Sequence, residues 1–251
     1  MQALNLVYRT RVPAGRVGVF GMGQAGFILK GADGFLLALD LYLSDICERA
    51  FGFRRLVPAP FLPGEASFDL VVASHAHFDH FDADSMPWLL RDAPLVCGRD
   101  CLAECQRLGL PLERVTPLGV GERTEEGDWG IEAVPCDHGE LAPQAVGLLL
   151  TIAGKRIYYM GDTAYRPDLL ENPRLQAPDA LLLPINGAFG NLNEEQAAQV
   201  VAKLRPGLAI PCHYGMFAAH GGAPQRFLAA LEEAAPGVPC ELLPIGRYAL
   251  I

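Results

Sequence analysis

The densest group of chemically capable side chains in the sequence is a short segment of six residues. His75, His77 and His80 are three of the six histidines in the chain, and Asp79 stands between the last two. Neutral imidazole and carboxylate are the ligands that zinc, manganese and iron accept in proteins. Histidines packed directly behind a buried strand would carry a desolvation penalty if they had no partner. We therefore interpret the segment as a metal site rather than as a histidine-rich surface turn.

An apolar strand expected over 69–73 must position this cluster. In open α/β sheets, reactive groups gather at the carboxyl ends of strands, which is where the cluster falls. His75 and His77, two residues apart in an extended turn, can both reach one ion. Asp79 and His80, displaced along the same turn, can reach a neighbouring ion.

The spacing of these residues also carries a family resemblance. His75-Ala-His77-Phe-Asp79-His80 resembles the H-x-H-x-D-H signature of the metallo-β-lactamase superfamily. The resemblance implies further ligands in order along the chain, each after a strand, and three later residues match it. One ion would then be held by His75, His77 and His138, the other by Asp79, His80 and His213, with Asp162 as the bridge between them.

Within that superfamily, four segments are most similar to the ascorbate-6-phosphate lactonase branch. They are the opening glycine-rich segment 20–26 and the later segments 183–187, 193–198 and 204–217. The chain is shorter than typical lactonases of that branch. The resemblance implies an α/β fold, a four-layer αβ/βα sandwich with two mixed sheets, formed by one domain over 1–251.

The pattern of apolar runs and turn signals is consistent with such an architecture. Turns at 32–34 and 153–155 each join two strand-like runs and predict two hairpins. Each half of the chain would then begin with a hairpin, a weak repeat that suggests an internally duplicated fold. Strands are expected over 26–30, 35–39, 69–73, 95–97, 130–134, 146–152, 156–160, 180–183 and 208–211.

Three helices are predicted from apolar periodicity and from end signals. Asn193 and Gln196 form a capping box for one helix, which Pro206 ends just after Arg205. The others are expected over 224–235 and 100–108. The segment 46–65, rich in Pro, Phe and Gly, is expected to be an ordered loop near an opening.

The chemistry implied by this centre is hydrolysis. Two divalent ions, Zn²⁺ or Mn²⁺, that share an oxygen lower the pKa of that water and supply hydroxide at neutral pH. Asp79 can orient the hydroxide and later return a proton to the leaving group. A small lactone or ester is the expected substrate. The alternatives are a phosphodiesterase acting on a small or nucleotide-type substrate, a non-catalytic metal-binding sensor, and a di-iron redox centre.

The sequence offers few groups that could contact the substrate. His220 could line the mouth of the site as a hydrogen-bond donor, or it could be a solvated loop histidine. Asn186, Tyr165 and Tyr214 flank proposed ligands, although tyrosine at strand ends is often plain packing. A sugar phosphate would need a cation such as Arg166, or a helix N-terminus.

Acceptors for the outer ring nitrogens of the ligand histidines are expected close to the ligands in sequence. The candidates are Ser74, Asp69, Asp82, Asp84 and Asp137. Three cysteines at 97, 101 and 105 have a spacing that invites an iron–sulfur interpretation. No fourth cysteine lies nearby, so buried thiols are the better explanation.

Composition excludes several classes of protein. The chain has 20 Lys and Arg against 29 Asp and Glu, a net charge of −9, which disfavours nucleic-acid binding. The apolar stretch 145–153 is far shorter than the ~20 residues of a membrane-spanning helix. The opening residues lack the apolar region of a secretory signal, and seven cysteines form no even disulfide framework. We expect a cytoplasmic enzyme, a small-molecule substrate, no membrane partner, and an oligomeric state that could include a homo-oligomer.

Overall fold

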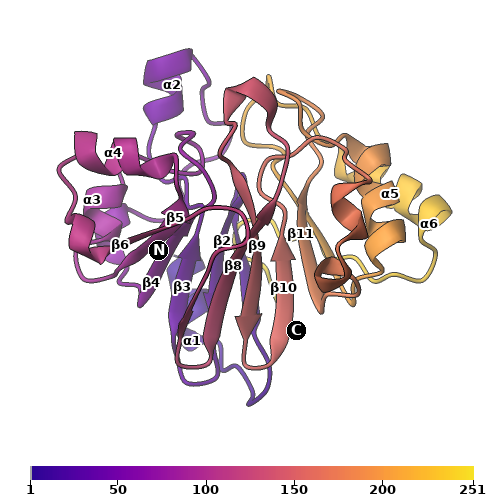
Figure 1. Cartoon of the computed structure of the whole chain (residues 1–251), viewed down its shortest axis with the longest axis horizontal. Helices are drawn as coiled ribbons and strands as arrows, with labels where there is room; N and C mark the ends of the chain where they lie inside the picture. Colours follow the sequence, from indigo (N-terminus) through magenta and orange to yellow (C-terminus); the bar gives the residue numbers. More distant parts are fainter. Residues whose placement is uncertain (1) are drawn as a thin grey trace.

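Two mixed β-sheets packed face to face form the centre of the molecule in the computed structural model, which describes residues 2–251 (Figure 1). The first sheet has the strand order β13-β1-β2-β3-β4-β5-β6, and the second has the order β12-β11-β10-β9-β8-β7. The strands of the first sheet are β1 (Gly18–Gly23), β2 (Gly26–Lys30), β3 (Leu36–Leu39), β4 (Leu70–Ala73), β5 (Leu95–Gly98), β6 (Val115–Leu118) and β13 (Tyr248–Leu250). Those of the second are β7 (Arg123–Glu126), β8 (Trp129–Pro135), β9 (Val146–Ile152), β10 (Lys155–Tyr159), β11 (Ala180–Pro184) and β12 (Ala209–Cys212).

Helices cover the outer faces of both sheets. Figure 1 shows α3 and α4 outside the first sheet and α5 and α6 outside the second. The helices are α1 (Gln2–Arg9), α2 (Ile46–Phe51), α3 (Met86–Leu89), α4 (Cys101–Arg107), α5 (Glu194–Leu204) and α6 (Pro224–Ala234). Short 3₁₀ turns are η1 (Pro63–Glu65), η2 (Leu112–Arg114), η3 (Gly139–Leu141), η4 (Leu169–Glu171) and η5 (Pro173–Leu175). The predicted four-layer α/β sandwich is confirmed.

Three apolar layers hold this sandwich together. The inner faces of the two sheets interdigitate, with Phe27 and Leu39 from one sheet in the same cluster as Leu148 and Ile210 from the other. A second cluster lies between the first sheet and α1, α3 and α4, and a third between the second sheet and α5 and α6. Strands buried on both faces read as continuous apolar runs, as most of these do.

All nine predicted strands are present, with ends that differ by at most one residue. Both predicted hairpins are also confirmed, since β2 pairs with β3 and β9 pairs with β10 in antiparallel register. In the second turn, Ala153 and Gly154 have φ of 49° and 77°, the left-handed conformation of a tight hairpin. Each sheet begins with antiparallel strands and continues with parallel ones, which matches the predicted internal duplication.

The α5 prediction is confirmed in detail. The side chains and backbone of Asn193 and Gln196 form the reciprocal capping box, and Arg205 ends the helix in a left-handed conformation. The predicted helices over 224–235 and 100–108 correspond to α6 and α4. No described helix is long and apolar enough to cross a membrane.

Several elements were not predicted. Strand β1 contains three glycines. A Cβ atom on Gly21 would lie 1.9 Å from the carbonyl oxygen of Leu243, so only glycine fits where the segment around Leu243 lies against the strand. Strands β6, β7 and β13 lie at or near sheet edges. Segment 46–65 is not all loop, because it begins with α2.

The strands that precede the candidate ligands all end at one rim of the sandwich. Strands β3 and β4 are parallel neighbours in the first sheet, and β10, β11 and β12 are parallel neighbours in the second. His75 follows β4, His138 follows β8, Asp162 follows β10 and His213 follows β12. Residues that are far apart in sequence therefore meet at this rim.

Candidate metal centre

Four of the predicted ligands form one tight cluster at the rim. His75 Nε2 lies 3.0 Å from His77 Nδ1, which lies 3.2 Å from His138 Nε2. His138 Nε2 is in turn 3.6 Å from Asp162 Oδ2. One ligand atom from each of these four residues lies within 4.8 Å of the others, a grouping that could hold a metal ion.

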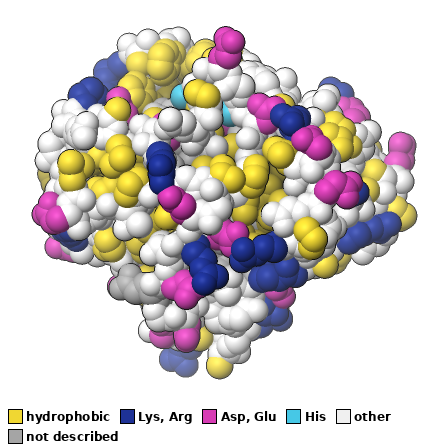
Figure 2. Space-filling model, viewed as in Figure 1, with side chains coloured by type: hydrophobic (Ala, Val, Ile, Leu, Met, Phe, Trp, Pro, Cys, Tyr) yellow, Lys and Arg dark blue, Asp and Glu magenta, His cyan; other side chains and the backbone are white. Residues whose placement is uncertain are grey.

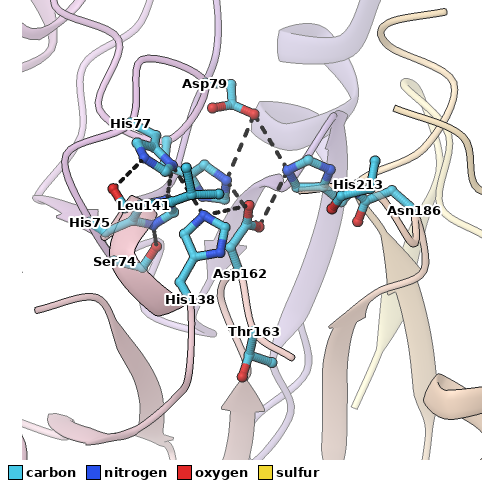
Figure 3. A network of polar contacts seen from close by, with 12 residues as sticks. Ser74, His75, His77, Asp79, His138, Leu141, Asp162, Thr163, Asn186 and His213 are labelled. Atoms are coloured by element: carbon cyan, nitrogen blue, oxygen red, sulfur yellow. Dashed lines mark hydrogen bonds and ion pairs between the residues drawn. The ribbon is translucent and has the colours of Figure 1, made fainter. Parts of the chain in front are cut away.

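The remaining predicted ligands form a second cluster on the other side of Asp162. Asp162 Oδ1 lies 3.2 Å from His80 Nε2 and 3.3 Å from His213 Nε2. His213 Nε2 is also 3.4 Å from Asp79 Oδ2. Figure 3 shows His75, His77 and His138 on one side of Asp162 and His213 on the other. The two oxygens of Asp162 therefore face one cluster each.

Outer hydrogen bonds determine which ring nitrogen of these histidines carries a proton. His80 Nδ1 donates to Asp40 Oδ2 at 2.6 Å, and His77 Nε2 donates to the carbonyl oxygen of Leu141 at 3.1 Å. Ser74 donates its hydroxyl proton to Asp40 Oδ2 and can accept from His75 Nδ1, which lies 3.0 Å away. Each of these three rings thus directs its other nitrogen inward, the atom with which it would bind a metal ion.

Inward lone pairs at such short separations repel one another unless a cation lies among them. The donor set of imidazole nitrogens and carboxylate oxygens fits zinc or manganese. Two buried atoms between the clusters, His80 Nε2 and Asp162 Oδ1, have no hydrogen-bond partner among the described residues. Buried polar atoms without partners are costly, so the geometry of the chain's own residues fits bound metal ions.

The charges and pKa values of the candidate ligands also fit bound metal ions. Burial lowers the pKa of His75 well below its usual value and that of His138 to about 4, which keeps both rings neutral. Burial acts in the same direction on His80 and His213, but the charges of Asp162 and Asp79 raise the pKa of His80 well above its usual value and that of His213 to about 9. Two buried carboxylates demand positive charge at the second cluster, which a divalent ion would supply.

Asp40 is the main site residue that sequence reasoning missed. It is fully buried, and besides Ser74 and His80 it accepts hydrogen bonds from the Tyr159 hydroxyl at 2.7 Å and the Ser74 backbone N–H at 2.8 Å. A signal was available, because Asp40 directly follows the predicted strand 35–39 at the same rim.

Among the predicted outer acceptors, only Ser74 contacts a ligand histidine. Asp82 accepts from the backbone N–H groups of Leu43 and Ser44 instead. The other three also have different partners: Asp69 accepts from the Leu36 backbone, Asp84 pairs with Arg49, and Asp137 pairs with Arg166.

Gln24 is the second residue that was missed. Its side-chain amide donates to Asp79 Oδ2 at 2.8 Å and lies 3.3 Å from His220 Nδ1, while its backbone carbonyl accepts from His213 N at 2.7 Å. The residue lies in the glycine-rich segment 20–26, which had been read only as a family feature. Gln24 therefore contacts two candidate ligands of the second cluster, Asp79 and His213.

Backbone strain is concentrated at this site. Gln24, Asp40, Phe189 and His213 have φ of 53°, 45°, 54° and 61°, four of the seven described non-glycine residues with positive φ. Such conformations cost about 1–3 kcal/mol each and persist where the surrounding structure holds them, often at functional sites. The strain supports the assignment of this rim as the site of function.

A pocket of about 480 Å³ opens beside the metal centre, a size suited to a small ligand. His77, Asp79, His138, Asp162 and His213 lie in its wall. The rest of the described wall consists of Cys47, Phe51, Phe53, Ala76, Phe78, Leu141, Phe189, Phe217 and His220. The predicted placement of segment 46–65 near an opening is confirmed by Phe51 and Phe53.

The fold and the ligand order have a counterpart among known families. The model of the β-lactamase superfamily domain matches residues 43–214, which span all the predicted ligands. The chain belongs to the metallo-β-lactamase superfamily. The matched range contains the H-x-H-x-D-H segment together with His138, Asp162 and His213.

Relatives and solved structures of the superfamily agree with this assignment. The chain is 30% identical to a UPF0173 metal-dependent hydrolase of Cupriavidus taiwanensis, over 90% of this chain and 84% of that protein. A metallo hydrolase of Ignicoccus hospitalis, Igni18, has a similar structure, with a TM-score of 0.73, 23% identity, and coverage of 94% and 98%. An isothiocyanate hydrolase from Delia radicum gut bacteria gives a TM-score of 0.77 at 17% identity, with coverage of 92% and 98%. The chain is thus a member of a metal-dependent hydrolase family.

Not every predicted substrate residue reaches the pocket of this metallo-β-lactamase fold. His220 lines the pocket, whereas Tyr165 and Tyr214 pack against the apolar layer beneath α5 and α6. Asn186 is buried beside His213, as Figure 3 shows, but is not part of the described wall. Arg166 is paired with Asp137 and Asp168.

The cysteine cluster belongs to the packing of the fold. Cys97, Cys101 and Cys105 are buried in the apolar layer between the first sheet and its helices. None of them belongs to a group of described side chains that could hold a metal ion. Their thiols act there as small apolar groups, as the sequence predicted.

Proposed function

We propose that the chain is a hydrolase that binds two divalent ions, zinc or manganese, and cleaves the ester bond of a small lactone or ester. The observation that carries this proposal is the set of imidazole nitrogens gathered around the two oxygens of Asp162. The resemblance to the ascorbate-6-phosphate lactonase branch supports a lactone as the first substrate class to test.

Bound ions would lower the pKa of water and polarise the substrate carbonyl. His75, His77 and His138 would hold one ion, and Asp79, His80 and His213 the other, with Asp162 shared. This assignment follows the two clusters on either side of Asp162.

Asp79 has a second role in the proposal. Its side chain lines the pocket, and the Gln24 amide restrains its Oδ2 atom. A carboxylate fixed in this way can take the proton of the attacking water and return it to the leaving oxygen. Breakage of the ester bond then yields a carboxylic acid and an alcohol.

His220 supplies a hydrogen-bond donor to the substrate. The Gln24 amide faces its Nδ1, so the ring proton belongs on Nε2, which is buried and has no partner among the described residues. We infer that this N–H donates to an oxygen of the substrate.

We also propose that the protein is located in the cytoplasm. Its seven free cysteines suit a reducing compartment.

Hydrolysis of lactones, esters and bis(p-nitrophenyl) phosphate by metal-loaded protein tests the proposal. We expect lactone or ester turnover that falls at least about 100-fold in His77→Ala, since a ligand for one ion is lost. Turnover of the phosphodiester alone would instead favour a phosphodiesterase. Two bound ions without turnover of any ester would favour a sensor, and either result contradicts the proposal.

A further inference from the structure

Six ring side chains form a continuous wall over the metal centre. They are Phe51, Phe53, Phe78, Phe189, Phe217 and His220, hereafter the aromatic wall, and neighbouring ring centroids lie 4.7–6.2 Å apart. The rings come from four separate parts of the chain: α2 and the residues after it, the metal-binding turn, the loop that follows β11, and the loop that follows β12. The fold thus brings aromatic groups from distant segments to one pocket.

Core packing accounts for only part of the aromatic wall: Phe217 is buried in an apolar cluster against which Phe53 and Phe78 pack. Phe51 and Phe189 keep 60% and 46% of their surface exposed, although both line the pocket. Phe189 also has a φ of 54°, a conformation that bulky residues rarely adopt. Figure 2 shows hydrophobic side chains gathered at the top of the molecule, over the position of α2, with histidine side chains beside them. Exposed apolar groups at a cavity mouth mark a surface that binds an apolar ligand.

The charge of the pocket complements this apolar character. None of the described residues that line it is Lys or Arg, and its charged side chains are Asp79 and Asp162, both assigned to the metals. Two arginines near α2 point their polar contacts away from the pocket wall: Arg49 pairs with Asp84, and Arg55 donates from Nη1 to the backbone carbonyls of Tyr42 and Ser44. A phosphate or carboxylate on the part of a substrate remote from the metals would be desolvated without a cation to pair with in the described wall.

We propose that the aromatic wall selects substrates whose non-reacting part is an uncharged aromatic or bulky hydrocarbon group. The inference rests on the proposed hydrolysis and names its substrate class. Offset and edge-to-face contacts with a substrate ring would add to the free energy of burying it. A sugar phosphate, as in ascorbate 6-phosphate, is then a poor substrate of this chain.

Three lactones that share one reacting ring test the selectivity of the metal-loaded protein. They are γ-butyrolactone, its γ-phenyl derivative and its γ-carboxylate derivative. We expect kcat/KM for the phenyl compound to exceed that for the parent by about tenfold or more, because a buried ring adds favourable transfer free energy. The carboxylate should fall below the parent. Equal rates for all three, or a preference for the carboxylate, would overturn the inference and leave the hydrolase proposal standing.

A pair of variants tests whether the aromatic wall causes the preference for the phenyl lactone. Phe53 contacts Phe51, Phe189, Phe217 and His220, whereas Phe35 packs on Trp129 in the sheet interior. Phe53→Ala should reduce the phenyl-to-parent ratio of kcat/KM by about fivefold or more, because the substrate ring loses a contact that the parent never makes. The matched control Phe35→Ala should keep the ratio. An unchanged ratio in Phe53→Ala contradicts the inference.

Binding of a neutral fluorophore, N-phenyl-1-naphthylamine, supplies a readout that needs no turnover. We expect binding to the protein that is weakened in Phe53→Ala, unchanged in Phe35→Ala, and competed by the phenyl lactone. Binding of this kind without hydrolysis of any lactone supports the aromatic site and contradicts the proposed function. A second cavity is lined by Val57 and Ile245, so loss of binding in Val57→Ser but not in Phe53→Ala would overturn the inference.

Discussion

Asp40 connects the two clusters of candidate ligands through a single buried carboxylate. Its Oδ2 accepts from His80 and Ser74, and Ser74 in turn faces His75, so one residue orients a ligand of each ion. Tyr159, from the second sheet, donates to the same oxygen at 2.7 Å. The orientation of the ligands therefore depends on a residue that would not contact either metal.

Replacement of Asp40 tests this role. Asp40→Asn removes the charge with little change of shape, and we expect metal affinity to fall about 10–100-fold, as is usual for partners of ligand histidines. Competition with a chromophoric chelator measures the affinity. Asp82→Asn is the matched control, since Asp82 is equally buried but holds backbone N–H groups of another loop. Equal losses in the two variants would mean that Asp40 matters only for folding.

At the scale of elements, the strands were predictable because their residues are buried on both faces and read as apolar runs. Strand β1 was not predictable from local propensity. It contains three glycines, and Gly21 is needed because the backbone of Leu243 lies against it. The seven candidate ligands follow strands that the pattern reveals, so their order was visible in the sequence. Gln24 and the aromatic wall depend on contacts between distant segments, which no local pattern encodes, whereas the position of Asp40 after a predicted strand was visible but its partners were not.

Helix α1 is attached to the first sheet by a buried lysine. Lys30, on β2, donates from Nζ to the carbonyl oxygens of Val7, Tyr8 and Thr10 at 2.8–3.1 Å. These carbonyls lie at the end of α1, where helix carbonyls have no partner within the helix. A cation at this end also complements the helix dipole.

Loss of this lysine should therefore destabilise the chain. We expect Lys30→Met to reduce the free energy of unfolding by about 2–4 kcal/mol, because buried carbonyls lose a charged donor. Urea unfolding followed by circular dichroism measures the change. Arg9→Met, at an exposed position of the same helix, should cost less than about 0.5 kcal/mol. The same stability in both variants would rule out Lys30 as the attachment of α1.

At the scale of the whole molecule, the metal centre joins the two sheets. His75, His77, Asp79 and His80 follow a strand of the first sheet, and the other three candidate ligands follow strands of the second. Ions that bind only the folded chain stabilise it according to their concentration and affinity.

Removal of metal should consequently lower the melting temperature. At free metal about 100 times the dissociation constant, each ion contributes about 2.7 kcal/mol, which corresponds to several degrees for a chain of this size. Calorimetry before and after treatment with a chelator measures the shift, and restored zinc or manganese should reverse it. A melting temperature that is insensitive to the chelator, with metal removal verified by elemental analysis, would contradict a site that bridges the sheets.

The central claim is that the seven candidate ligands hold two ions that together support hydrolysis. Metal-free protein titrated with zinc or manganese, with lactone turnover followed at each addition, tests it most directly. We predict that activity rises until two equivalents per chain are bound and then stays constant. Saturation of binding at one ion or fewer per chain, or full activity without metal, would contradict the account.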